Sequence, residues 1–159
     1  MPRIAIVLAL AAMTSAASHA QEPQRRRVLP ELRADVVIGH VLSAQLAAGV
    51  HITSGTYFRV ALLGGYGRAW SENETSDSYR AEVQGRFHLD PLRSNRFGLY
   101  GIGGVTAGHD SFAGSQSRLV LGAGAELPAY ARTTFAVEAV LAGGLRLSLA
   151  VRRVPLGRR

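Results

Sequence analysis

The segment 78–90 alternates between apolar and polar residues over its whole length, and this feature constrains the fold more than any other. Its odd positions carry apolar residues or glycine, and its even positions carry polar residues such as Arg80, Glu82 and Arg86. A period of two predicts a β-strand with one apolar and one polar face. Strands of soluble proteins are usually about five or six residues long. A strand of this length is typical of a small barrel that spans a membrane.

The first residues of the chain read as an export signal that is removed from the mature protein. Arg3 is followed by an apolar stretch that is too short for a spanning helix, and Ser18, His19 and Ala20 form a small-x-small cleavage site. We therefore divide the chain into four parts, namely a signal peptide (1–20), a flexible Arg/Pro-rich lead-in (21–33), a β-barrel domain (34–153) and a basic tail (154–159).

Further alternating stretches follow one another through the barrel domain, separated by turn signals. They lie at 34–52, 57–71, 97–109, 116–127, 132–142 and 145–153. The first reads as one long strand, as two strands that meet near 39–43, or as a partly helical segment. Successive hairpins predict an all-β fold, an antiparallel up-and-down β-barrel, and we expect eight strands if the first stretch divides in two.

Loop lengths follow from which face of each strand is apolar, because facing residues of a hairpin share a face. Apolar residues occupy even-numbered positions before 72–77 and odd-numbered positions after it, and this change requires a loop with an even number of residues. A loop of six residues would set Ser71 opposite Ser78. Apolar residues occupy odd-numbered positions both before and after Gly143 and Gly144. This hairpin therefore requires a loop with an odd number of residues, such as three.

The polar face carries charges of both signs, which suits a narrow lumen filled by ion pairs. The residues expected in this polar network are Arg80, Glu82, Arg86, His88, Arg118, Glu126, Glu138 and Arg146. Aromatic residues lie towards the strand ends on the apolar face, and those expected to face lipid or form its girdles are Phe58, Trp70, Tyr79, Phe87 and Phe135. Phe58 and Trp70 would be roughly 30 Å apart along the membrane normal, close to the height of an apolar band with its girdles.

The chain resembles the small outer-membrane β-barrels of Gram-negative bacteria, the family that includes the transmembrane part of outer membrane protein A. The resemblance lies in the alternating pattern of about 34–153. It implies an even strand number and a location in the outer membrane. Many members end in an aromatic residue, whereas this sequence ends in Val-Pro-Leu-Gly-Arg-Arg. The function expected is a structural or surface-interaction role, and not that of a general porin, because eight strands leave room for little beyond side chains.

Other functions remain open at this stage. A periplasmic lipocalin-like barrel that binds an apolar small molecule would reverse the two faces. A lipid-modifying enzyme would need a nucleophile and a base close together; the candidates are His88 with Ser78 or Glu82, and His109 with Asp110 and Ser111.

We expect no enzyme activity, no cofactor and no metal, since the histidines show no ligand spacing. Although the formal net charge is +7, we expect no nucleic-acid partner, because export and the lack of aromatic–basic platforms argue against one. The expected partners are outer-membrane lipid and a cell-envelope polymer or surface ligand, with the protein itself a monomer.

Overall fold

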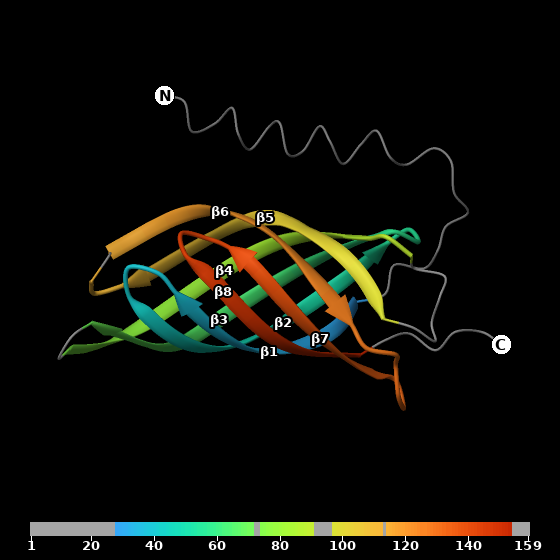
Figure 1. Ribbon diagram of the computed structural model, residues 1–159, viewed down its shortest axis with the longest axis horizontal. Coiled ribbons are helices and arrows are strands. Elements are labelled where there is room, and N and C mark those ends of the chain that lie inside the picture. Colours follow the sequence, from blue (N-terminus) through green and yellow to red (C-terminus); the bar gives the residue numbers. More distant parts are fainter. Residues whose placement is uncertain (1–27, 72–73, 91–96, 113, 154–159) are drawn as a thin grey trace, which may run out of the picture.

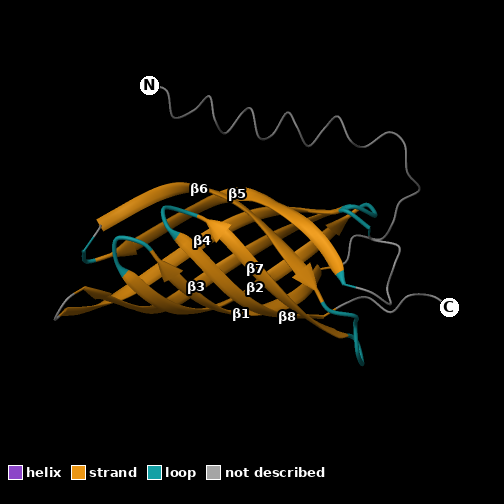
Figure 2. Cartoon of the chain, viewed as in Figure 1, coloured by secondary structure: helices purple, strands orange, loops and turns teal. Residues whose placement is uncertain are grey.

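The chain closes into a single eight-stranded antiparallel barrel in which each strand pairs with its neighbours in the sequence and β1 pairs with β8 (Figure 1). This computed structural model describes residues 28–71, 74–90, 97–112 and 114–153. Across these ranges only strands and connecting loops occur (Figure 2), so the prediction of an all-β up-and-down barrel is confirmed. None of the described residues forms a helix long and apolar enough to cross a membrane. The predicted signal peptide and basic tail lie outside the described residues.

The last two strands, β7 and β8, are shorter than the other six. In chain order they are β1 (Val28–Ile38), β2 (Leu42–Ser54), β3 (Phe58–Ser71), β4 (Glu74–His88), β5 (Gly98–Asp110), β6 (Gly114–Glu126), β7 (Thr133–Leu141) and β8 (Leu145–Arg153). The stretch 34–52 is therefore divided into two strands, and the loop at 39–41 separates β1 from β2.

The start of the barrel was predicted wrongly, because β1 begins at Val28 and not at 34. Residues 28–33 were assigned to the flexible lead-in on account of Pro30 and the arginines before it. The pairing of β1 with β8 starts only at Glu31 and Arg152. The β1–β8 ladder therefore does not need the backbone N–H that Pro30 lacks. The remainder of the predicted lead-in, 21–27, lies outside the described residues.

Two hairpins test the loop lengths derived from the pattern. Ser71 pairs with Glu74, so an even number of residues separates β3 from β4 as expected, but the predicted pairing of Ser71 with Ser78 is wrong. Residues 74–77 extend β4 instead of forming a loop. Leu141 pairs with Leu145, and the three-residue connection that contains Gly143, at a φ of 79°, confirms the odd loop.

The two ends of the barrel differ in what they carry (Figure 1). The hairpin end has the connections β1–β2, β3–β4, β5–β6 and β7–β8. The terminal end has the other connections, together with the start of β1 at Val28 and the end of β8 at Arg153. Both names are used below.

The strands direct most of their charged residues inward and most of their large apolar residues outward, and the interior also holds a buried apolar cluster that includes Ile102, Val120 and Val140. Glu31, Arg86 and Glu138 are at most 1% exposed, whereas Leu46 and Leu119 are each 73% exposed. A soluble barrel has the opposite arrangement. The barrel interior is therefore its charged region, and the outer wall is apolar.

Candidate functional site: the charged lumen and the apolar outer wall

The lumen is held together near the terminal end by Glu31 on β1. Its carboxylate accepts hydrogen bonds from both terminal nitrogens of Arg86 on β4, at 2.6 and 2.7 Å. The Nε of Arg152 on β8 lies 3.0 Å from the same carboxylate. A planar guanidinium matches a carboxylate in this two-point geometry, so Glu31 links three strands of which β4 is not a neighbour of β1.

Glu138 on β7 forms the second centre, in the middle of the lumen. Arg33 and Arg152 both donate hydrogen bonds to its carboxylate, and the hydroxyl of Tyr100 donates a third at 2.7 Å. The guanidinium of Arg152 also lies 5.3 Å from the centre of the Tyr100 ring, a cation–π distance. Glu138 is fully buried. Arg33 and Arg152 compensate its charge, together with Arg86, whose Nε lies 3.4 Å away.

Glu82 on β4 forms the third centre, towards the hairpin end. Arg146 on β8 donates to its two oxygens at 2.5 and 2.7 Å. Next to it Arg80 pairs with Asp35, and its Nε lies 3.3 Å from Glu82. These contacts again cross the lumen, from β4 to β8 and from β4 to β1.

At the terminal mouth of the lumen Glu126 on β6 receives hydrogen bonds from Arg59 at 3.0 Å and Arg152 at 2.8 Å. His88 lies 4.0 Å from Glu126, and its ring stacks on Tyr100 at a centroid distance of 5.0 Å. Arg152 thus connects Glu126 to the centres at Glu31 and Glu138. Arg33, whose Nε lies 3.6 Å from Asp35, joins the third centre to Glu138, so the ion pairs form one continuous network.

Breaking any part of this network should be costly. An isolated buried charge loses its hydration, so removal of one partner of a buried ion pair usually costs about 3–5 kcal/mol. The network does not by itself make the barrel more stable than an apolar filling would. It does fix which strands face one another across the lumen and occupies the space between them.

The eight residues predicted for the polar network all lie on the inward-facing side of their strands. Six take part in the ion pairs described above, and His88 lies beside Glu126 and Tyr100. The eighth, Arg118, lies at the hairpin mouth. There it donates hydrogen bonds to the side chain of Gln116 and, at 3.4 Å, to the backbone oxygen of Ala142. A small cavity of about 80 Å³ lies beside it, lined in part by Gln45 and Arg146.

Sequence reasoning missed several members of the network. The missed residues that carry its main contacts are Glu31, Arg33, Asp35, Arg59, Tyr100 and Arg152. A signal for the first three was present, because they alternate with Leu32, Ala34 and Val36. Pro30 obscured it for Glu31 and Arg33, whereas Asp35 lay within the predicted stretch 34–52, whose odd positions are mixed. Tyr100 gave no signal, since an aromatic residue was expected on the outer wall.

The five predicted lipid-facing aromatic residues all lie on the outer wall. At the terminal end Phe58 pairs with Phe87. Towards the hairpin end Tyr66, which was not predicted, pairs with Tyr79, and the two rings are 5.2 Å apart.

The apolar part of β3 and β4 ends at this tyrosine pair. Beyond it, Arg68 faces Asp77 on the outer wall, and Asp77 accepts a hydrogen bond from Tyr66 at 3.0 Å. Trp70 lies beyond these charged residues. On these strands Tyr66 and Tyr79 therefore mark the edge of the apolar band on the side of the hairpin end. The edge expected from the sequence is at Trp70, which lies nearer the hairpin end.

The alternative of a barrel with an apolar binding cavity is wrong. Val83 and Phe87, which would line such a cavity, are 40% and 53% exposed on the outer wall. The neighbouring inward positions of β4 carry Glu82 and Arg86.

The enzyme candidates are not brought together in the expected way. Ser78 accepts a hydrogen bond from Gln45 at 2.6 Å, and His88 contacts Glu126 and Tyr100 instead. His109 lies 3.0 Å from Ser115, while the backbone N–H of Ser111 donates to Ser76. Among the described residues no group of histidines and carboxylates could hold a metal ion.

No protein-family model and no curated protein matches the sequence. Solved structures with a similar fold do exist. Neisserial surface protein A is 12% identical over 79% of this chain and 94% of its own, with a TM-score of 0.55. A de novo designed transmembrane β-barrel is 14% identical over 85% of this chain and 98% of its own, with a TM-score of 0.50. The attachment invasion locus protein of Yersinia pestis is 14% identical over 79% of this chain and 91% of its own, with a TM-score of 0.42.

The closed barrel, the charged interior and the apolar exterior together define a class of protein. Among β-structures only a closed barrel can place apolar side chains in lipid without leaving unpaired backbone groups at a sheet edge. An apolar outer wall bordered by aromatic residues around a polar interior is the arrangement of outer-membrane barrels. The chain is a small, closed eight-stranded β-barrel with the architecture of such barrels, as the resemblance in its sequence implied.

Proposed function

We propose that this barrel is a closed, non-conducting protein of the outer membrane with a structural or surface-interaction role, and that it acts as a monomer surrounded by lipid. The observation that supports the proposal most strongly is the ion-pair network that fills the lumen. A general porin needs a water-filled channel, and here arginine and carboxylate side chains occupy the interior instead.

The middle of the lumen argues most directly against conduction. An ion that moved along the barrel axis would have to pass Glu138, whose carboxylate is occupied by Arg33, Arg152 and Tyr100. It would also have to pass Glu31, which is bonded to Arg86. Displacing these partners would leave buried charges unpaired.

Conductance in planar lipid bilayers tests this proposal. We expect the purified protein to show no steady conductance above that of the bare membrane. The double variant Arg33→Ala/Glu138→Ala, which removes two side chains from the middle of the lumen, should conduct measurably. The matched control Arg68→Ala/Asp77→Ala removes a facing pair from the outer wall and should stay closed. A large, steady conductance of the unmodified protein would contradict the proposal.

A role in surface interactions requires that the hairpin end face the outside of the cell. Exposed polar residues gather there, among them Glu74 and Asp77, while Arg132 is exposed at the terminal end. Because the sequence contains no cysteine, single-cysteine variants are free of background. We expect Glu74→Cys, but not Arg132→Cys, to react with a membrane-impermeant maleimide on intact cells. The opposite labelling would place the hairpin end inside.

A further inference from the structure

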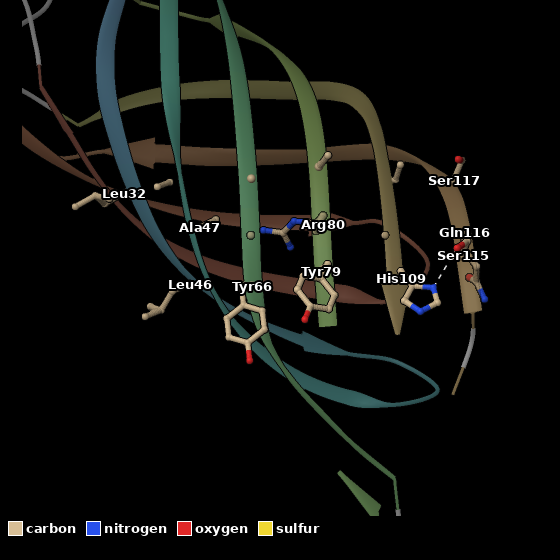
Figure 3. A pocket seen from close by; sticks show the side chains of 16 residues that line it. Leu32, Leu46, Ala47, Tyr66, Tyr79, Arg80, His109, Ser115, Gln116 and Ser117 are labelled. Atoms are coloured by element: carbon tan, nitrogen blue, oxygen red, sulfur yellow. Dashed lines mark hydrogen bonds between the residues drawn. The ribbon is translucent and has the colours of Figure 1, made fainter. Parts of the chain in front are cut away.

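A row of small residues crosses the outer wall and forms the floor of a groove (Figure 3). Each member is the direct cross-strand partner of the next, from β2 to β6. The row consists of Ala48, Gly64, Ala81, Ala107 and Ser117. We call the hollow above it the outer groove.

Two rows of larger residues form the walls of the outer groove, and they too are made of direct cross-strand partners. The wall on the hairpin side consists of Leu46, Tyr66, Tyr79 and His109, and its row ends at the small residue Ser115. The opposite wall consists of Val50, Leu62, Val83, Val105 and Leu119. Two adjoining hollows of about 780 and 700 Å³ share the floor between these walls.

The width of the outer groove limits what can occupy it. The two wall rows are four residues apart on each strand, so their Cα atoms are separated by about 13 Å. The wall side chains themselves take up part of this distance. A helix is about 10–12 Å wide with its side chains and is therefore too broad, whereas a single extended hydrocarbon chain fits. The floor spans five strands, or about 19 Å at the usual strand spacing.

The two ends of the outer groove differ in polarity. At the β5–β6 end His109, Ser115 and Ser117 provide an imidazole and two hydroxyls, and His109 and Ser115 lie 3.0 Å apart. At the β1–β2 end the lining is apolar and includes Leu32 and Leu46. The floor and the hairpin-side wall of the groove are thus polar at the β5–β6 end and apolar at the β1–β2 end, while the opposite wall is apolar up to Val105 and Leu119.

The outer groove is tilted relative to the membrane surface, and the direction of the tilt agrees with the difference in polarity between its two ends. At the polar end Ala107 lies three residues from the hairpin end of β5 at Asp110, whereas at the apolar end Ala48 lies six residues from that of β2 at Leu42. The polar end is therefore nearer the membrane surface and the apolar end is deeper, as the polar and apolar parts of a lipid are.

The charges next to the outer groove are balanced. Arg80, which also lines the hollow, is paired with Asp35. Arg68 and Asp77 lie beyond the tyrosine wall and are direct partners, so the arginines do not form a cationic cluster. A strongly anionic headgroup would require several unpaired arginines or lysines. A zwitterionic headgroup needs none.

We propose that the outer groove is a specific site for one acyl chain of a zwitterionic phospholipid. The tail lies over Gly64 and Ala81 towards Leu46, and the ester end of the lipid lies beside His109, Ser115 and Ser117. This inference rests on the proposed location of the barrel in the outer membrane.

Native mass spectrometry of the folded, full-length mature protein tests the site, with phosphatidylethanolamine as the probe. Gly64→Leu fills the floor of the outer groove, and Gly103→Leu is the matched control on the outer wall, because an added Cβ meets no atom within 4 Å at either position. We expect one bound phosphatidylethanolamine on the parent and on Gly103→Leu after a delipidating wash, and at least a fivefold lower occupancy on Gly64→Leu. Equal occupancy of the two variants would overturn the site.

A second blocking variant and two other lipids complete the test. Ala81→Leu fills the same floor one strand away and should also lose the lipid if Gly64→Leu fails to fold. In competition, we expect phosphatidylethanolamine to displace phosphatidylglycerol and lipid A. Preferential binding of either anionic lipid would overturn the assignment of the headgroup. Recovery of each variant in carbonate-washed outer membranes separates the two proposals, because a barrel absent from membranes would contradict the proposed function itself.

Discussion

Glu31 on β1 and Arg86 on β4 form a two-point ion pair across the lumen, with hydrogen bonds of 2.6 and 2.7 Å. The two strands are not neighbours in the sheet, so the pair fixes the distance between opposite walls of the barrel. Both side chains are almost fully buried. The pair therefore illustrates how this barrel uses its charged residues, which fill the interior and leave the outer wall apolar.

Removing the charge of Glu31 should destabilise the barrel strongly. In Glu31→Gln the guanidinium groups of Arg86 and Arg152 lose a shared carboxylate, and we expect the free energy of unfolding to fall by about 3–5 kcal/mol. Urea unfolding in lipid vesicles, followed by the fluorescence of the single tryptophan, Trp70, measures this change. Glu74→Gln, at an exposed position, is the control and should shift stability by no more than about 0.5 kcal/mol. Equal effects of the two substitutions would contradict the network.

Glu82 and Arg146 should be energetically coupled, because each is the direct partner of the other. In a double-mutant cycle of Glu82→Gln and Arg146→Gln, we expect the double variant to be less destabilised than the sum of the single variants, by about 1–3 kcal/mol. In the reference cycle Arg132→Gln replaces Arg146→Gln, because Arg132 is exposed at the terminal end and lies outside the ion-pair network that contains Glu82. There the effects should add to within about 0.5 kcal/mol. Additivity in both cycles would show that the predicted coupling is absent.

Two glycines that pack differently should respond differently to the same substitution. A Cβ at Gly49 would lie 1.9 Å from the backbone oxygen of Leu62, whereas one at Gly64 would meet nothing within 4 Å. We expect Gly49→Ala to destabilise the barrel by about 1–3 kcal/mol, and Gly64→Ala to be neutral or stabilising by up to about 1 kcal/mol. The same urea titration decides the matter, and a tolerated Gly49→Ala would argue against the observed approach of β2 to β3.

Arginine on the outer wall should be penalised according to its depth in the membrane. Leu46→Arg places a charge in the apolar band, beside Tyr66, and should cost more than the same change at Ile38, close to the hairpin end, which should cost no more than about 1 kcal/mol. Folding yield and unfolding free energy in lipid vesicles measure the difference. A smaller penalty at Leu46 than at Ile38 would be inconsistent with a lipid-facing position.

The alternation of polar and apolar residues was sufficient to predict most of the barrel. Strands β3 to β8 were predicted within a few residues of their observed bounds, because each has one polar and one apolar face. The closing strand, 145–153, was predicted with both ends correct. The start of β1 was missed because local cues such as Pro30 and the preceding arginines resemble those of a flexible segment. The pairing with β2 and β8 that makes this segment a strand is not visible locally.

The sequence indicated which residues face the lumen but not which ones meet. Glu31 and Arg86 are 55 positions apart, and their contact depends on the closure and register of the whole barrel. The outer groove was missed for the same reason. Ala48, Gly64 and Ala81 are unremarkable on their own strands and form a row only when the two registers that pair these strands are known.

The orientation of β4 is the central claim of this account, and cysteine scanning of 78–88 tests it most directly. A fluorophore attached at each position would be read in lipid vesicles with a lipid-soluble quencher. We predict strong quenching at Tyr79, Val83 and Phe87 and weak quenching at Ser78, Glu82 and Arg86. The reverse pattern, with the even positions quenched by lipid and Val83 and Phe87 protected, would contradict the account.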